Sequence, residues 1–170
     1  MTMIALLFSE VRVSAVADTP VLLLREASGP RHLAVWITAT GANAILSALE
    51  EPDPAHPAAH DLALEMLAAA GEVIDAVHIT GVCDGVFDAQ VVVAGKPIHA
   101  RVSDAIAFAL RCGAPIFASP ELMQTAGIGR HAASADDAED GDVSDEQLAR
   151  FREFLDSINP EDFEGEGPQP

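Results

Sequence analysis

The same order of strand-like and helix-like patterns occurs twice along this chain, and this apparent repeat constrains the fold more than any other feature. Ala42–Leu49 aligns with Ser103–Leu110, and Glu65–Gly71 aligns with Glu121–Gly127. A hairpin pattern precedes each half, so we expect a duplicated hairpin–helix–helix unit. The alternative is that alanine-rich helices resemble one another by chance. A duplicated unit of this kind predicts an α+β domain with a mixed or antiparallel sheet and flanking helices.

Glycine and proline residues divide the chain into short segments whose periodicity predicts their structure. The predicted strands are Phe8–Val16, Val21–Glu26, Arg31–Ile37, Glu72–Val82, Val86–Ala94, Ile98–Val102 and Pro115–Ser119. The predicted helices are Ala42–Glu50, Asp61–Ala70, Ser103–Cys112 with Ser103 as N-cap, and a last helix from Pro120 to Gly127. These elements place the folded domain in residues 1–128.

The composition changes after this domain. Residues 129–142 are polar and acidic and are expected to be a disordered linker. Residues 143–170 are expected to hold a C-terminal helix and an acidic tail, because Ser144–Gln147 fits a capping box and apolar residues follow at helical spacing. Such a short helix is expected to dock on the domain or on a neighbouring subunit.

The charge and cysteine content exclude some classes of protein. The chain has 27 acidic and 9 basic residues, so no basic patch is large enough for non-specific binding to nucleic acid or to anionic lipid. The two cysteines are far apart, which argues against a disulfide scaffold and fits a reducing cytoplasm. The apolar run at the start is too short for a membrane span, so we expect a cytoplasmic protein without a membrane partner.

Six short motifs follow one another between residues 8 and 127. They are Pro20–Glu26 (PVLLLRE), Val35–Ile37 (VWI), His60–Leu62 (HDL), Asp84–Ala89 (DGVFDA), Ala100–Ile106 (ARVSDAI) and Gly113–Phe117 (GAPIF). In this order they resemble the bifunctional nuclease family, and Phe154–Phe163 resembles the tail of its actinobacterial members. The resemblance implies cleavage of DNA and RNA.

The chain departs from the family pattern at several motif positions while it keeps the apolar ones. The departures are Thr38, Gly41, Ala59, Asp88, His99 and Val102. We therefore expect a divergent member that keeps the fold and whose activity is retained, altered or lost.

Hydrolysis of a phosphodiester needs an activated water and stabilisation of the charge on the phosphorus oxygens. Divalent metals on carboxylates, or a histidine base with a cation, can supply both. His60 and Asp61 lie at a predicted helix start, where His60 is a candidate general base and Asp61, with Asp104, a candidate ligand of Mg²⁺ or Mn²⁺. The alternative is structural, with Asp61 stabilising the helix start and His60 packing beside it.

Arg101 and Ser103 lie at a predicted strand–helix junction that could hold a phosphate. The alternative is that Ser103 caps the helix and Arg101 pairs with a nearby carboxylate. Arg25, at the end of a predicted strand, is a further candidate for substrate binding, with exposed edge charge as its alternative.

Two weaker patterns concern metal and base binding. Asp84, Asp88 and His99 lie on one predicted hairpin and could bind a metal if Asp88 and His99 pair across it, although Asp84 is a common turn residue. Trp36 is expected in the core with Leu33 and not on a base-stacking surface.

Two hypotheses of function follow. The first is a phosphodiesterase, weak or vestigial, that acts on single-stranded or double-stranded nucleic acid through His60, Asp61, Arg101 and Asp104. The second is a non-catalytic, homo-oligomeric interaction module of the same fold. The sequence has no P-loop, GxGxxG, GxSxG or HExxH motif, which argues against a small-molecule enzyme.

Overall fold

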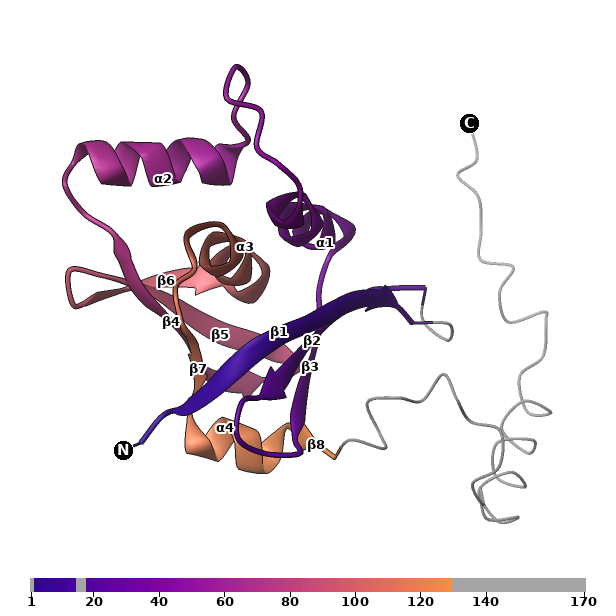
Figure 1. Ribbon diagram of the computed structural model, residues 1–170. Coiled ribbons are helices and arrows are strands. Elements are labelled where there is room, and N and C mark those ends of the chain that lie inside the picture. The colour runs from indigo at the N-terminus through magenta and orange to yellow at the C-terminus, as the bar shows by residue number, and fades with distance from the viewer. Residues whose placement is uncertain (1, 15–17, 130–170) are drawn as a thin grey trace, which may run out of the picture. The chain divides into compact units, whose positions relative to one another are not determined.

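Eight strands form one mixed sheet in the computed structural model, which describes residues 2–14 and 18–129 (Figure 1). The strands are β1 (Ile4–Val13), β2 (Pro20–Glu26), β3 (His32–Trp36), β4 (Ile74–Cys83), β5 (Val86–Val93), β6 (Lys96–Arg101), β7 (Ile116–Ala118) and β8 (Gly127–Ile128). Their order in the sheet is β6-β5-β4-β7-β1-β2-β3-β8. β4 and β7 are parallel, and the other pairs described are antiparallel.

Each half of the sheet is a three-stranded meander followed directly by a helix. The helices are α1 (Ala39–Leu46), α2 (Ala59–Ala69), α3 (Val102–Cys112) and α4 (Pro120–Thr125), with a short 3₁₀ turn, η1 (Ser47–Leu49), after α1. β1–β2–β3 leads into α1, and β4–β5–β6 leads into α3. The prediction of an α+β fold with a mixed sheet and flanking helices is therefore confirmed, whereas the internal duplication stays a prediction.

The core lies between the sheet and its helices. In Figure 1, α1, α2 and α3 lie above the sheet and α4 lies below it. All four residues of Val21–Leu24 in β2 are buried, so both faces of this strand are covered. α3 buries Ala105, Ile106, Ala107 and Ala109, and these mostly small side chains let its backbone approach its neighbours closely.

Two hairpins of the second meander turn through pairs of residues with positive φ. Asp84 and Gly85 have φ of 50° and 77°, and Ala94 and Gly95 have φ of 49° and 70°. Positive φ at both central residues is typical of the two-residue turns whose twist matches that of the flanking strands. The Asp84–Gly85 turn directs β5 back along β4, and the Ala94–Gly95 turn directs β6 back along β5 to the start of α3.

The structure differs from the sequence prediction at several element ends. β1 begins at Ile4 and not at Phe8, because its first residues pair with β7. The predicted last helix ends at Thr125, because Gly127–Ile128 pairs with β3 as β8.

The linker beyond Gly129 and the C-terminal helix predicted for residues 143–170 lie outside the described residues. None of the helices within residues 2–14 and 18–129 is long and apolar enough to cross a membrane.

Candidate functional site

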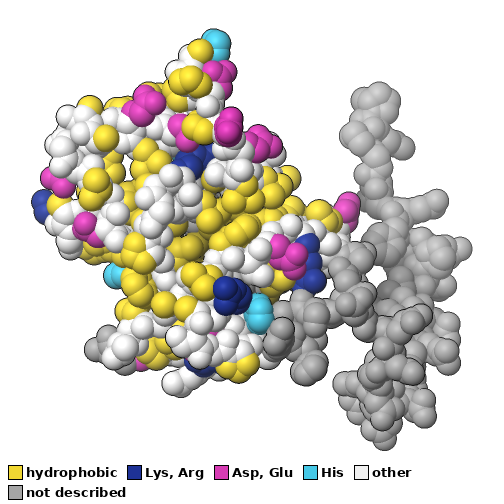
Figure 2. All heavy atoms as spheres, in the orientation of Figure 1, with side chains coloured by type: hydrophobic (Ala, Val, Ile, Leu, Met, Phe, Trp, Pro, Cys, Tyr) yellow, Lys and Arg dark blue, Asp and Glu magenta, His cyan; other side chains and the backbone are white. Residues whose placement is uncertain are grey.

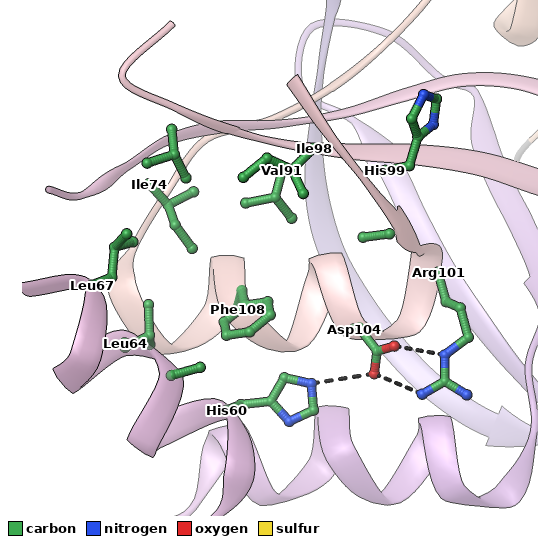
Figure 3. Close-up of a pocket in the computed structure, with 13 residues that line it drawn as sticks. His60, Leu64, Leu67, Ile74, Val91, Ile98, His99, Arg101, Asp104 and Phe108 are labelled. Atoms are coloured by element: carbon green, nitrogen blue, oxygen red, sulfur yellow. Dashed lines mark hydrogen bonds and ion pairs between the residues drawn. The ribbon is translucent and has the colours of Figure 1, made fainter. Parts of the chain in front are cut away.

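Three residues predicted for the site meet at the starts of two helices. His60 is the second residue of α2, Asp104 lies in the first turn of α3, and Arg101 is the residue that precedes α3. Asp104 Oδ1 accepts a hydrogen bond from His60 Nε2 at 3.2 Å. Arg101 donates from Nε to Asp104 Oδ2 at 2.6 Å and from Nη2 to Oδ1 at 3.1 Å (Figure 3). A carboxylate thus holds a histidine and an arginine in fixed positions.

The contact with Asp104 fixes which nitrogen of His60 can accept a proton. A carboxylate only accepts hydrogen bonds, so Nε2 carries the hydrogen in this contact and Nδ1 of the neutral ring keeps its lone pair. The edge-on contact with Phe108, whose ring centre lies 4.8 Å from that of His60, restricts the imidazole further. The pair therefore has the geometry of a histidine base oriented by a carboxylate.

Asp104 remains ionised because of its two partners. Burial raises the pKa of its carboxyl group, but the hydrogen bonds and charge of Arg101, with the hydrogen bond from His60, hold the pKa below its ordinary value. The Arg101 side chain is 68 % exposed, and its other N–H groups have no partner among the described residues. The guanidinium can therefore bind a phosphate while it stays paired with Asp104.

The cluster lies at one end of a cavity of about 540 Å³, which we call the His60 cavity. Its walls come from α2, α3 and the second meander, and they include Leu64, Leu67, Ile74, Val91, Ile98 and Phe108 (Figure 3). The cavity is thus mostly apolar, with polar groups gathered at the end formed by the helix starts.

Asp61 lies apart from this cluster. Its Oδ1 accepts a hydrogen bond at 2.9 Å from Nε of Arg111, a side chain that is only 5 % exposed. Arg111 also donates to the carbonyl oxygens of Ala44 and Ala107 and to the hydroxyl of Ser47. This network joins α1, η1, α2 and α3, so Asp61 makes an ion pair between helices, a contact that neither the metal-ligand hypothesis nor the helix-start alternative predicted.

The other predicted substrate-binding residues are less accessible or more distant. Ser103 is 7 % exposed and does not cap α3, whose N-cap residue is Arg101, so the prediction of a serine cap is wrong. Ser103 packs so closely on Gly41 that a Cβ atom at Gly41 would lie 2.7 Å from its Oγ. Arg25 is exposed on β2, which is an interior strand of the sheet and not an edge strand. It pairs with His32 at the first residue of β3, whereas Trp36 is the last residue of that strand.

The described residues contain no group of three or more His, Cys, Asp or Glu side chains arranged to hold a metal. Asp88 pairs in register with Arg101, and His99 pairs with Gln90, so Asp88 and His99 do not face each other as the hairpin hypothesis required. The His99 ring also points away from Asp104 in Figure 3.

Trp36 is exposed, contrary to the prediction that it is part of the core. Leu33 and Val35 are buried, and the two-residue period of a strand places Trp36 on the opposite face, where it is 53 % exposed. The alternation of the aliphatic residues Leu33, Val35 and Ile37 was the sequence signal that could have placed Trp36 correctly.

The sequence of this chain is similar to a known family and to two curated proteins over most of its length. The model of the bifunctional nuclease domain matches residues 22–131, a range that includes the His60–Asp104–Arg101 cluster and the described fold except β1 and the first two residues of β2. Two proteins of Mycobacterium tuberculosis, the uncharacterized protein Rv1829 of strain H37Rv and the uncharacterized protein MT1877 of strain CDC 1551 / Oshkosh, are each 36 % identical over 154 residues. Each alignment covers 90 % of this chain and 93 % of the relative. From the matched domain and the extent of these alignments, the chain belongs to the bifunctional nuclease domain family.

Proposed function

We propose that this protein hydrolyses phosphodiester bonds of DNA or RNA at the His60–Asp104–Arg101 cluster. Membership of the bifunctional nuclease domain family supports nuclease chemistry at the level of the family. The observation that carries the proposal is the convergence of two predicted residues, His60 and Arg101, on the carboxylate of a third, Asp104. A histidine base and a cation form one of the two sets of groups that can supply this chemistry, and the carboxylate orients them.

The proposed reaction assigns one task to each side chain. His60 Nδ1 takes a proton from a water molecule, whose oxygen attacks phosphorus as the bond to the leaving oxygen breaks. A proton from solvent completes the leaving hydroxyl group. Arg101 donates hydrogen bonds to the non-bridging oxygens, where negative charge accumulates. Asp104 keeps both partners oriented and stabilises the imidazolium that forms.

The expected Mg²⁺ or Mn²⁺ stays a prediction, and the carboxylates predicted as its ligands do not fit a shared metal site. Both oxygens of Asp104 accept hydrogen bonds within the cluster, and Asp61 faces Arg111 instead of Asp104. We therefore assign no step of the reaction to a metal, and the assay below includes metal and chelator.

The charge of the protein limits how strongly it can attract a nucleic acid. The chain carries a net charge of −18, and on the face drawn in Figure 2 the Lys and Arg side chains are scattered while acidic side chains gather over the α1–α2 connection. Binding through Arg101 alone is expected to be sensitive to salt, so the activity should be measured at low ionic strength.

The test is cleavage of labelled single-stranded DNA and RNA by the purified full chain with Mg²⁺, Mn²⁺ or EDTA. His60→Ala should lower the rate by about a hundredfold or more, the usual contribution of a general base. Arg101→Ala should lower it by a similar factor through the lost oxyanion donor. His56→Ala is the matched control, because His56 is exposed and, among the described residues, its ring pairs with Asp53 alone. Equal cleavage by wild type and both site variants would refute the assignment.

A non-catalytic, homo-oligomeric module is the second proposed function, and exposed apolar side chains favour it. No residue of α2 is buried, and Leu62 and Met66 on this helix are exposed, as is Ile98 on the edge strand β6. Surfaces of this kind commonly mark contacts between proteins. Light scattering should then show an oligomer that Met66→Glu dissociates, and a monomeric wild type would exclude this function.

A further inference from the structure

Arg101 also lines a second hollow, which lies where the end of β3, the start of β5 and the start of α3 meet. This hollow, of about 250 Å³, includes Trp36, Thr38, Val86, Phe87, Arg101 and Ser103 in its lining, and we call it the Trp36 hollow. Arg101 also lines the His60 cavity, so one guanidinium borders both depressions. A phosphate bound to Arg101 would therefore lie next to both depressions, and each could receive one of the nucleotides that it joins.

The lining of the Trp36 hollow suits a flat aromatic ligand attached to an anion. Trp36 and Val86 are large apolar residues that remain well exposed, and Phe87, the next residue in β5, is half-buried in the same lining. An indole with a free surface offers a stacking plane to any nucleobase, because every base has a π-face. Among the described residues, Arg101 is the only charged side chain in this lining, so the hollow has a cation that can pair with the phosphate of a stacked nucleotide.

We infer that the Trp36 hollow binds an unpaired nucleobase next to the phosphate held by Arg101, which makes single-stranded DNA or RNA the preferred ligand. The inference rests on the proposed function and specifies its substrate. A base paired within a duplex is already stacked between its neighbours and would have to leave the helix to reach Trp36. A strand with free bases has no such cost, so the hollow selects against duplexes.

The sequence provides a direct probe of this site. The chain contains one Trp and no Tyr, so the indole fluorescence of the full-length protein comes from Trp36 alone. Stacking of a base on Trp36 should quench this fluorescence. The ligand for the titration is a decathymidylate with phosphorothioate linkages, which slow cleavage, and an abasic strand of the same length and charge separates base stacking from phosphate attraction.

The expected result is quenching by the decathymidylate, little quenching by the abasic strand, and weaker binding of a duplex of the same length. With a labelled decathymidylate, Trp36→Leu should bind about fivefold to a hundredfold more weakly, the range typical for loss of one stacked base. Trp36→Phe keeps an aromatic face and should bind within a few-fold of wild type. Leu49→Ala removes an equally exposed apolar side chain outside both depressions and should bind normally. Circular dichroism checks that each variant is folded.

The outcomes separate this inference from the proposed function. Equal binding of the abasic strand and the decathymidylate, or undiminished binding by folded Trp36→Leu, would overturn base stacking even if the protein cleaves. Quenching and Trp36-dependent binding in a protein that never cleaves would support the base site and refute the phosphodiesterase. A change of Trp36 emission on serial dilution of the protein alone would show that a second copy covers the hollow, which also overturns the inference.

Discussion

The Arg111 network predicts a large loss of stability when its cation is removed. In Arg111→Met the apolar stem is kept, but the ion pair to Asp61 and the hydrogen bonds to Ala44, Ser47 and Ala107 are lost. Removing one partner of a buried ion pair typically costs about 3–5 kcal/mol, because the other charge is left without compensation. The side chain of Asp61 is 21 % exposed, so water relieves part of this cost and we expect about 3 kcal/mol.

Urea unfolding followed by far-ultraviolet circular dichroism measures this loss. The free energy of unfolding should fall by about 3 kcal/mol in Arg111→Met without a change in slope. The double variant Arg111→Met/Asp61→Leu removes both charges and should recover most of the loss. A free energy of unfolding for Arg111→Met within about 0.5 kcal/mol of wild type would refute the network, since changes of that size are ordinary for surface substitutions. If the Asp61→Asn variant is as stable as wild type but no longer cleaves, Asp61 takes part in catalysis and its assignment as a structural residue is wrong.

Two further predictions concern packing and acidity. Gly41→Ala gains about 1 kcal/mol of helix propensity but forces a Cβ atom to 2.7 Å from Ser103 Cβ, at an overpacking cost of about 1–3 kcal/mol. We expect net destabilisation that Ser103→Gly relieves, measured as a double-mutant cycle, and additive effects of the two substitutions would contradict the close approach. The pKa of Asp104 is lower in the folded protein than in the unfolded chain, where it is about 3.9. Its ion pair therefore stabilises the fold fully above the unfolded pKa, and this stability is lost as the pH falls through the folded pKa. The difference in unfolding free energy between wild type and Asp104→Asn should therefore be constant at neutral pH and shrink below about pH 4, and an undiminished difference at lower pH would contradict the ionised pair.

The elements of the fold follow from local patterns, but the partners of the side chains do not. Gly113 at φ 71° and the Asp84–Gly85 turn illustrate positions where residue type alone predicts a helix end or a hairpin. His60 and Asp61 show the limit of this reasoning. Consecutive helical residues differ by about 100° in direction, so these neighbours contact opposite ends of α3: His60 contacts Asp104 in its first turn, and Asp61 contacts Arg111 in its last turn.

The same limit explains the errors at Ser103 and Trp36. Whether α3 begins at Val102 or at Asp104 depends on how β6 leads into it, and the earlier start makes Ser103 a buried helical residue instead of a capping residue. Trp36 is apolar, but its face is set by the register of β3 against β2, in which it pairs with Val21. Residue type predicted burial, whereas strand register determined exposure.

The order in which the ribosome makes the strands differs from their order in the sheet. β7 has three residues and lies between β1 and β4, although six strands precede it in the chain. Until Ile116–Ala118 emerge, β1 and β4 each keep an unpaired edge, and edges of this kind can recruit strands from other molecules. The nascent chain is therefore most vulnerable to aggregation just before this segment is synthesised. The two meanders join into one sheet only when the three residues of β7 pair with β1 and β4.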